Sequence, residues 1–139
     1  MSEGFVADSS VGVAWAVHSQ ASQTTDQLLE KVAAGTPVVV PSLWSFEVAN
    51  SLLVLLRRKR VLAEERGRAL DALGRLPLVV DDEGCRLAFA KTSDLAVEHG
   101  LSVYDAAYLE LALRRKLPLA SRDEALCEAA RHCRVRLLL

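Results

Sequence analysis

The sequence predicts an α/β domain in which a central parallel β-sheet of about five strands is flanked by α-helices. Short apolar runs alternate with long helical patterns along the whole chain, and such alternation is typical of parallel sheets with helices on both faces. The 139 residues, 51% hydrophobic and 25% charged, are enough for a soluble domain with its own core. Because the chain has no internal repeat and no linker, residues 1–139 are expected to form one domain.

Five apolar segments are predicted as strands of this sheet. The clearest is a β-branched run between Pro37 and Pro41, which is typical of a short buried strand. The predicted strands, in chain order, are Phe5–Ala7, Val38–Val40, Leu78–Val80, Pro118–Ala120 and Val135–Leu138.

Helical patterns fill the segments between these strands. Gly35 and Gly100 each follow such a pattern, and glycine is typical just past a helix end. The predicted helices are Val11–His18, Thr24–Ala34, Leu43–Lys59, Ala63–Leu73, Glu83–His99, Ser102–Lys116 and Asp123–Cys133.

Charge, cysteine content and hydropathy exclude several classes of protein. The net charge of −1 argues against binding nucleic acid through overall charge, although it leaves room for a local basic rim. Cys85, Cys127 and Cys133 have neither CxxC nor zinc-ligand spacing, which is typical of reduced thiols. With no basic region typical of a signal peptide and no apolar stretch long enough to span a bilayer, we expect a cytoplasmic protein without membrane contact.

Four acidic residues stand at four predicted element boundaries. Asp8 and Asp123 directly follow predicted strands, whereas Glu47 and Asp105 lie in the first turns of predicted helices. Ligands of such folds bind outside the carboxyl ends of the strands, so these side chains are expected to converge there. A pocket lined by carboxylate oxygens suits a hard divalent cation, Mg²⁺ or Mn²⁺, better than zinc or copper.

Each of these acids also has a simpler interpretation. Asp8 and Asp123 are suitable N-caps for the helices that follow them, and Ser102 with Asp105 fits a capping box. Glu47 is either solvated or favourably placed near a helix N-terminus. Only the four positions taken together favour a site over a set of caps.

Four segments carry a more specific pattern. With Phe5–Val11, Pro41–Asn50, Leu101–Leu109 and Pro118–Leu126 in this order and spacing, the chain resembles the PIN-domain ribonucleases, most closely the VapC-type toxins of bacterial and archaeal toxin–antitoxin pairs. The likeness covers essentially the whole chain. Its most specific part is Leu-Ser-Val-Tyr-Asp-Ala-Ala-Tyr-Leu, at 101–109, followed by Leu-Ala-Ser-Arg-Asp, at 119–123.

The resemblance implies a metal-dependent endoribonuclease with Mg²⁺ or Mn²⁺ as cofactor and RNA as substrate. The family's acidic quartet falls on Asp8, Glu47, Asp105 and Asp123. Ser121 stands where the family commonly has threonine, and it keeps the hydroxyl. The resemblance further implies a five-stranded parallel sheet, a homodimer, and inhibition by an antitoxin whose tail lies over the site.

Within this site Asp8 and Asp105 are the expected direct metal ligands. Asp123 would complete the shell, and Glu47 would bind the metal or orient the attacking water. The residues expected to hold the carboxylates in place or to face the same pocket are Ser10, Asn50 and Ser121.

Basic side chains have two open interpretations. Arg122 is placed either to contact an RNA phosphate or to form a salt bridge. Arg57–Arg60 and Arg114–Lys116 close helices, where cations favour the helix dipole, but they equally suit an RNA backbone.

Three other features of the sequence indicate a structural role or a contact with another chain. Asp81–Glu83 is expected to cap the helix that follows it. Leu52–Leu56 makes its helix apolar almost all round, which predicts burial in the core or a contact with a second copy or an antitoxin. Histidine-based RNA cleavage is not expected, because separate predicted helices without evident pairing hold His18, His99 and His132.

Three alternative functions make different demands on the sequence. A signalling receiver domain needs an acidic pair after the first strand and a lysine after the fifth, and the chain has neither at Asp8–Ser10 or at Val135–Leu139. A catalytically inactive PIN-like binding module is disfavoured by the presence of all four acids. A PIN nuclease of RNA processing outside a toxin–antitoxin pair stays open.

Overall fold

The computed structural model describes residues 4–139, in which four parallel strands form one sheet with the order β3-β2-β1-β4. In the central pair, Phe5 lies opposite Val38 and Val6 opposite Val39. All strands run in one direction, so their carboxyl ends lie along one edge of the sheet. The strands are β1 (Phe5–Ala7), β2 (Val38–Pro41), β3 (Leu78–Asp81) and β4 (Leu119–Ala120).

The predicted fifth strand, Val135–Leu138, is reduced to a single parallel bridge between Leu119 and Leu137. Two backbone hydrogen bonds hold it: the N–H of Leu119 donates to Arg136 at 2.9 Å, and the N–H of Leu138 donates to Leu119 at 3.0 Å. β4 is only two residues long and offers no room for a longer ladder. The α/β class is confirmed, with four strands in place of about five.

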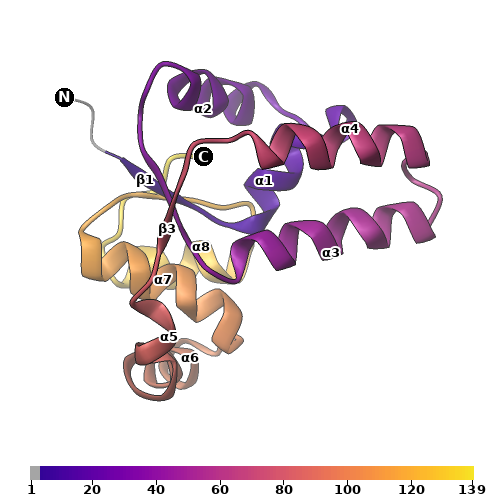
Figure 1. Cartoon of the computed structure of the whole chain (residues 1–139). Coiled ribbons are helices and arrows are strands. Elements are labelled where there is room, and N and C mark those ends of the chain that lie inside the picture. Colours follow the sequence, from indigo (N-terminus) through magenta and orange to yellow (C-terminus); the bar gives the residue numbers. More distant parts are fainter. Residues whose placement is uncertain (1–3) are drawn as a thin grey trace.

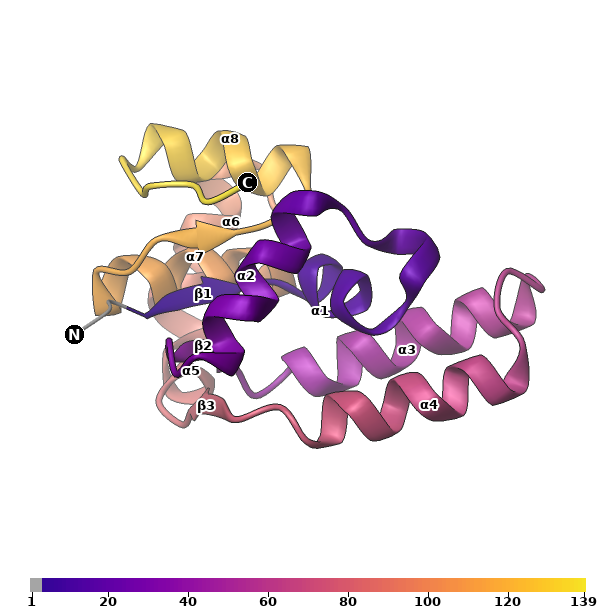
Figure 2. The same cartoon turned by 90° about the horizontal axis from the view of Figure 1, so that it is seen from above.

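Helices cover both faces of the sheet (Figures 1 and 2). α1 and α2 lie on one side, whereas α7 lies on the other and contacts β1, β2 and β4. The buried side chains between these layers form one core, in which the largest are Trp44 and Tyr108. The helices are α1 (Ser9–Ala16), α2 (Gln23–Ala33), α3 (Trp44–Arg57), α4 (Ala63–Gly74), α5 (Gly84–Leu87), α6 (Ser93–His99), α7 (Val103–Arg115) and α8 (Glu124–His132).

The segment predicted as one helix, Glu83–His99, is interrupted by a π-helical turn at Ala88–Thr92, which separates α5 from α6. The hydroxyl of Ser93 donates to the carbonyl of Ala88, five residues earlier, at 2.8 Å. A wide turn of this kind is a local expansion of an α-helix. The periodicity of apolar residues does not reveal it.

α3 and α4 run side by side as a hairpin that extends from the body of the molecule (Figure 1). The prediction that Leu52–Leu56 is buried is only partly right: Leu52 is fully buried, whereas residues 53–56 are half-buried. Arg57–Arg60 follows at the exposed tip of this hairpin. An apolar contact with another chain at residues 53–56 stays a prediction. Within residues 4–139, no helix is both long enough and apolar enough to cross a membrane.

Candidate active site

Asp8 is a buried carboxylate at the carboxyl end of β1, with 4% of its surface exposed. One carboxylate oxygen, Oδ1, accepts the hydroxyl of Ser10 at 2.5 Å and the N–H of Val11 at 3.3 Å, and the latter bond caps α1. The other, Oδ2, accepts the hydroxyl of Ser121 at 2.5 Å. Asp8 is therefore held by neutral donors on both sides.

The same two serines connect the ends of β1 and β4. Ser121 accepts the N–H of Asp123 at 2.9 Å, and Ser10 accepts the N–H of Arg122 at 3.1 Å. Each hydroxyl thus donates to Asp8 and accepts from the loop that precedes α8. This network fixes the position of Asp8 relative to Asp123, although the two residues lie far apart in the sequence.

Trp44, whose role the sequence does not reveal, anchors the backbone of Asp8. Its indole N–H donates to the carbonyl of Asp8 at 3.1 Å. Gly12 makes room for this ring, because a Cβ at position 12 would lie only 2.5 Å from a ring carbon of Trp44. The first turn of α3 is thereby locked against the start of α1.

Glu47 and Asp105 lie in the first turns of α3 and α7, both half-buried. Glu47 accepts the hydroxyl of Tyr108 at 2.5 Å through Oε1. Ser102 caps α7 by accepting the N–H of Asp105 at 3.0 Å. The two helices start near the carboxyl edge of the sheet because α3 follows β2 and α7 ends just before β4.

Asp123 is exposed and caps α8, since its Oδ1 accepts the N–H of Leu126 at 2.8 Å. Asp8 also caps a helix, so the capping interpretation of both residues is correct. A cap uses the side chain only in part, and it orients the carboxylate at the edge where α1 and α8 begin. Capping and site formation are therefore compatible here.

The pKa values of the carboxylates depend on their burial and on one another's charges. Burial raises the pKa of Asp8, against the lowering effect of its hydroxyl donors. Burial also raises the pKa of Asp105, and the charges of Asp123 and Asp8 raise it further. Burial and repulsion from Asp105 and Asp8 raise the pKa of Glu47, whereas the hydroxyl of Tyr108 lowers it. Carboxylates that raise one another's pKa lie close enough to repel, which is the situation that a bound cation relieves.

The donor set fits a hard divalent cation in its chemistry. None of the four acids forms an ion pair with a lysine, arginine or histidine within the part of the chain that the structure describes. Carboxylate oxygens are the ligands that Mg²⁺ and Mn²⁺ prefer. Across residues 4–139, no three His, Cys, Asp or Glu side chains are grouped tightly enough to hold an ion as they stand. Repulsion between the carboxylates favours such spacing when no cation is present.

Two further predicted site residues are exposed. Asn50 makes no side-chain hydrogen bond to the described residues, and its place in the pocket stays a prediction. Arg122 forms no ion pair with any carboxylate of residues 4–139, so the salt-bridge alternative is not supported. Its guanidinium is left available for an anionic ligand next to Asp123.

A second buried aspartate, Asp81, lies at the same edge, at the end of β3, and is 2% exposed. It caps α5 as predicted, by accepting the N–H of Gly84 at 2.8 Å. The sequence did not reveal its ion pairs with Arg114 at 2.8 Å and Arg115 at 3.0 Å. Hydrogen bonds from Arg114, and then from Arg115, lower the pKa of Asp81 to about 2. These two arginines therefore have a structural role.

The prediction that the histidines lack pairing is wrong for two of them. The rings of His99 and His132 lie 6.5 Å apart, and Nε2 of His99 lies 3.4 Å from the sulfur of Cys133. Packing of α6 beside α8 brings them together, which residues 33 positions apart do not reveal. Among the described residues, neither ring contacts any of the four acids, and all three cysteines are free thiols.

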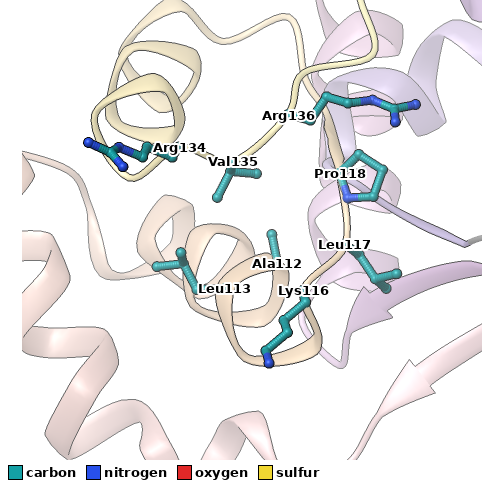
Figure 3. A pocket seen from close by; sticks show the side chains of 8 residues that line it. All are labelled: Ala112, Leu113, Lys116, Leu117, Pro118, Arg134, Val135 and Arg136. Atoms are coloured by element: carbon teal, nitrogen blue, oxygen red, sulfur yellow. The ribbon is translucent and has the colours of Figure 1, made fainter.

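A pocket of about 330 Å³ lies at the opposite, amino edge of the sheet (Figure 3). Its floor is apolar, and its rim carries Lys116, Arg134 and Arg136. Figure 3 shows these three basic side chains pointing in different directions and not toward a common point. They end α7 or follow α8, where cations favour the helix dipole. The pocket therefore shows no convergent anion site.

Comparison with known proteins identifies the family. The chain has the fold of PAE2754 from Pyrobaculum aerophilum, at 22% identity and a TM-score of 0.70 over 97% of this chain and 83% of that one. It also has the fold of FitAcB from Neisseria gonorrhoeae, at 21% identity and a TM-score of 0.61 over 97% and 96%. A search of curated proteins gave no match. The model of the PIN domain matches residues 5–132, and the chain therefore belongs to the PIN domain family.

Proposed function

We propose that this protein is an endoribonuclease that uses Mg²⁺ or Mn²⁺. PIN domains are generally nucleases and typically use divalent metals. The observation that carries the proposal is the set of four acids at one edge of the sheet, three of them with raised pKa and none in an ion pair with another residue of 4–139. Such a set is unfavourable by itself, and a divalent cation stabilises it.

The four acids and two serines would have different roles in this reaction. Asp8 and Asp105 are proposed as direct ligands, with Asp123 completing the shell and Glu47 binding the metal or orienting the attacking water. When bound, the cation would lower the pKa of a water and stabilise charge on the phosphate. Ser10 and Ser121 would keep both oxygens of Asp8 oriented, because each hydroxyl donates to one of them.

RNA binding would rely on local charge, because the net charge of the chain is −1. Arg122 is exposed, unpaired with any carboxylate of the described residues, and adjacent to Asp123. It is therefore the best-placed cation for a phosphate next to the scissile bond. Arg57–Arg60 lies at the tip of the α3–α4 hairpin, about 20 Å of helix away from the start of α3.

We further propose a toxin of the VapC type, neutralised by an antitoxin. The sequence resemblance is the main support. An apolar groove of about 180 Å³ beside the starts of α3 and α7 would suit a peptide segment, and its lining includes Leu43, Ala88, Val103 and Ala107. Homodimer formation is proposed from the same resemblance. Expression with and without a small neighbouring gene, followed by light scattering of the purified protein, tests both statements.

The decisive experiment is incubation of purified protein, freed of any partner, with total cellular RNA. We expect discrete cuts with Mn²⁺, none with chelator, and none with Asp105→Asn, which should fold normally. Metal-dependent cuts in a folded Asp105→Asn protein would remove this residue from the mechanism. Absence of both cuts and Mn²⁺ binding in the wild type would favour an inactive PIN-like binding module. Cuts confined to one precursor RNA, without toxicity in cells, would favour an RNA-processing nuclease.

A further inference from the structure

Tyr108 is a buried tyrosine whose hydroxyl reaches the proposed site. It lies on α7, is 1% exposed, and donates to Oε1 of Glu47 on α3 at 2.5 Å. The two residues are 61 positions apart, and this is the hydrogen bond that connects their side chains across the start of the two helices. Burial and the Glu47 carboxylate raise the pKa of Tyr108, so its hydroxyl stays a donor at neutral pH.

We propose that Tyr108 is the positioning residue of the site, which fixes the carboxylate of Glu47 so that one oxygen is held and only Oε2 is left for a metal ion or a water. Oε1 is the acceptor in the bond to Tyr108, and no described residue donates to Oε2. The inference rests on the proposed function. It adds a role for a residue that lies outside the four acids.

The geometry of α7 explains why the bond matters for the site as a whole. Asp105 and Tyr108 are three residues apart, and residues at this spacing lie on neighbouring positions of one helix face. A bond from Tyr108 to Glu47 therefore sets the spacing between an acid of α3 and an acid of α7. Without it, Glu47 is free to change rotamer at the rim, where it is only half-buried.

A purely structural role is the competing explanation, because Tyr108 is among the largest buried side chains. Tyr108→Phe separates the two roles, since the ring stays and only the hydroxyl is lost. The chain supplies a matched control: its only other tyrosine, Tyr104, lies on the same helix and is 64% exposed, and within residues 4–139 its hydroxyl makes no hydrogen bond to any of the four acids. Tyr104→Phe makes the same chemical change one helical turn away.

The first readout is Mn²⁺ affinity, measured by electron paramagnetic resonance without RNA. Loss of a residue that orients a metal ligand typically weakens metal binding or activity by about 10–100-fold. We expect Tyr108→Phe to weaken Mn²⁺ binding by about 10-fold and to lower kcat with little change in KM for RNA. Tyr104→Phe should match the wild type in all three measurements.

The second readout is a double-mutant cycle with Glu47→Ala. If Tyr108 acts through Glu47, Tyr108→Phe causes no further loss of Mn²⁺ affinity or kcat in the Glu47→Ala background. Equal losses in both backgrounds would overturn the inference, as would a Tyr108→Phe protein that matches Tyr104→Phe. In either case the wild type still binds Mn²⁺ and cleaves RNA, so the proposed function stands. A wild type that does neither refutes the proposed function, and the inference falls with it.

Discussion

Asp8 and Asp81 are the same residue type at the same edge of one sheet, yet their surroundings are opposite. Asp8 directly follows β1 and Asp81 ends β3, and both are almost fully buried, at 4% and 2% exposure. Two arginines hold Asp81 and lower its pKa to about 2, whereas the described residues offer Asp8 only hydroxyl and amide donors, and burial raises its pKa. A buried carboxylate paired with arginines has a structural role. A buried carboxylate without such a pair is what the proposed metal site would need.

The largest expected effect separates the two aspartates by function. Asp8→Asn should lower Mn²⁺-dependent RNA cleavage by more than about 100-fold, because it removes a proposed ligand and not merely a residue that orients one. In chelator its melting temperature should equal or exceed that of the wild type, since a buried charge without a partner is lost. Turnover assays and thermal melts of the same preparation measure both. A folded Asp8→Asn protein with a tenth of wild-type activity would contradict the assignment.

Asp81→Asn should show the reverse pattern. Removing one partner of a buried ion pair typically costs about 3–5 kcal/mol, because the other charges are left uncompensated. Here Arg115 loses the carboxylate that it binds at 3.0 Å, whereas Arg114 loses Asp81 at 2.8 Å but keeps Glu110 at 2.8 Å, so the loss should lie at the low end of this range. Urea denaturation measures the loss, and Mn²⁺ affinity of the folded variant should stay within about 2-fold of the wild type, since no proposed ligand changes.

An exposed ion pair provides the control for this prediction. Glu128→Gln breaks only surface contacts with Arg131 and His132, and such pairs contribute little. Its urea midpoint should be nearly that of the wild type. Equal losses in Asp81→Asn and Glu128→Gln would show that the buried network has no special role in stability.

The pH dependence of the free energy of unfolding should show opposite effects of the carboxylates with raised pKa and of Asp81. Asp8, Glu47 and Asp105 have pKa values raised above 3.8 or 4.5, so the folded protein holds protons that the unfolded chain releases. Without metal, stability should therefore rise as the pH falls from neutral through these raised values. Asp81 acts oppositely: its contribution is complete above 3.8 and is lost as the pH falls toward about 2. Melts in chelator should show a maximum on the acidic side of neutrality.

Bound Mn²⁺ should remove the rise in stability toward acidic pH that Asp8, Glu47 and Asp105 cause. The contribution of Asp81 should stay. A cation that binds only the folded state at 100 times its Kd stabilises it by about 2.7 kcal/mol. Because the ligands must be ionised, this gain should grow with pH and oppose the slope seen in chelator. A Mn²⁺-independent melting temperature at pH 7 would contradict a metal site.

The smallest effect is expected at Arg122. Arg122→Ala should weaken RNA binding modestly and reduce the slope of log affinity against log salt by about 1, as for loss of one phosphate contact. Mn²⁺ affinity should be unchanged. Arg136→Ala, at the amino edge of the sheet, is the matched control and should leave the salt slope as it was.

Local patterns predicted most of the fold because they depend on neighbouring residues. The β-branched run at Val38–Val40 forms β2, and the long amphipathic segments form the predicted helices within a few residues of their ends. The prediction of a fifth strand was wrong because a strand needs a partner of matching length, and β4 is only two residues long. The π-helical turn at Ala88–Thr92 could not be predicted, because it alters hydrogen bonding without altering the apolar pattern.

The four acids could be proposed as a site because element boundaries are visible in the sequence and parallel strands bring their carboxyl ends to one edge. The hydrogen bonds of Tyr108 to Glu47 and of Trp44 to Asp8 could not be predicted, since a sequence does not distinguish a buried aromatic ring that makes such a bond from one that only fills the core. The sequence by itself thus determined the fold class and which acids stand at the ends of strands or the starts of helices, because both follow from local order. Only the tertiary structure decided that Asp81 gains two arginines of α7 while Asp8, among the described residues, gains the hydroxyls of Ser10 and Ser121, because such partners come from distant parts of the chain, up to 113 positions away.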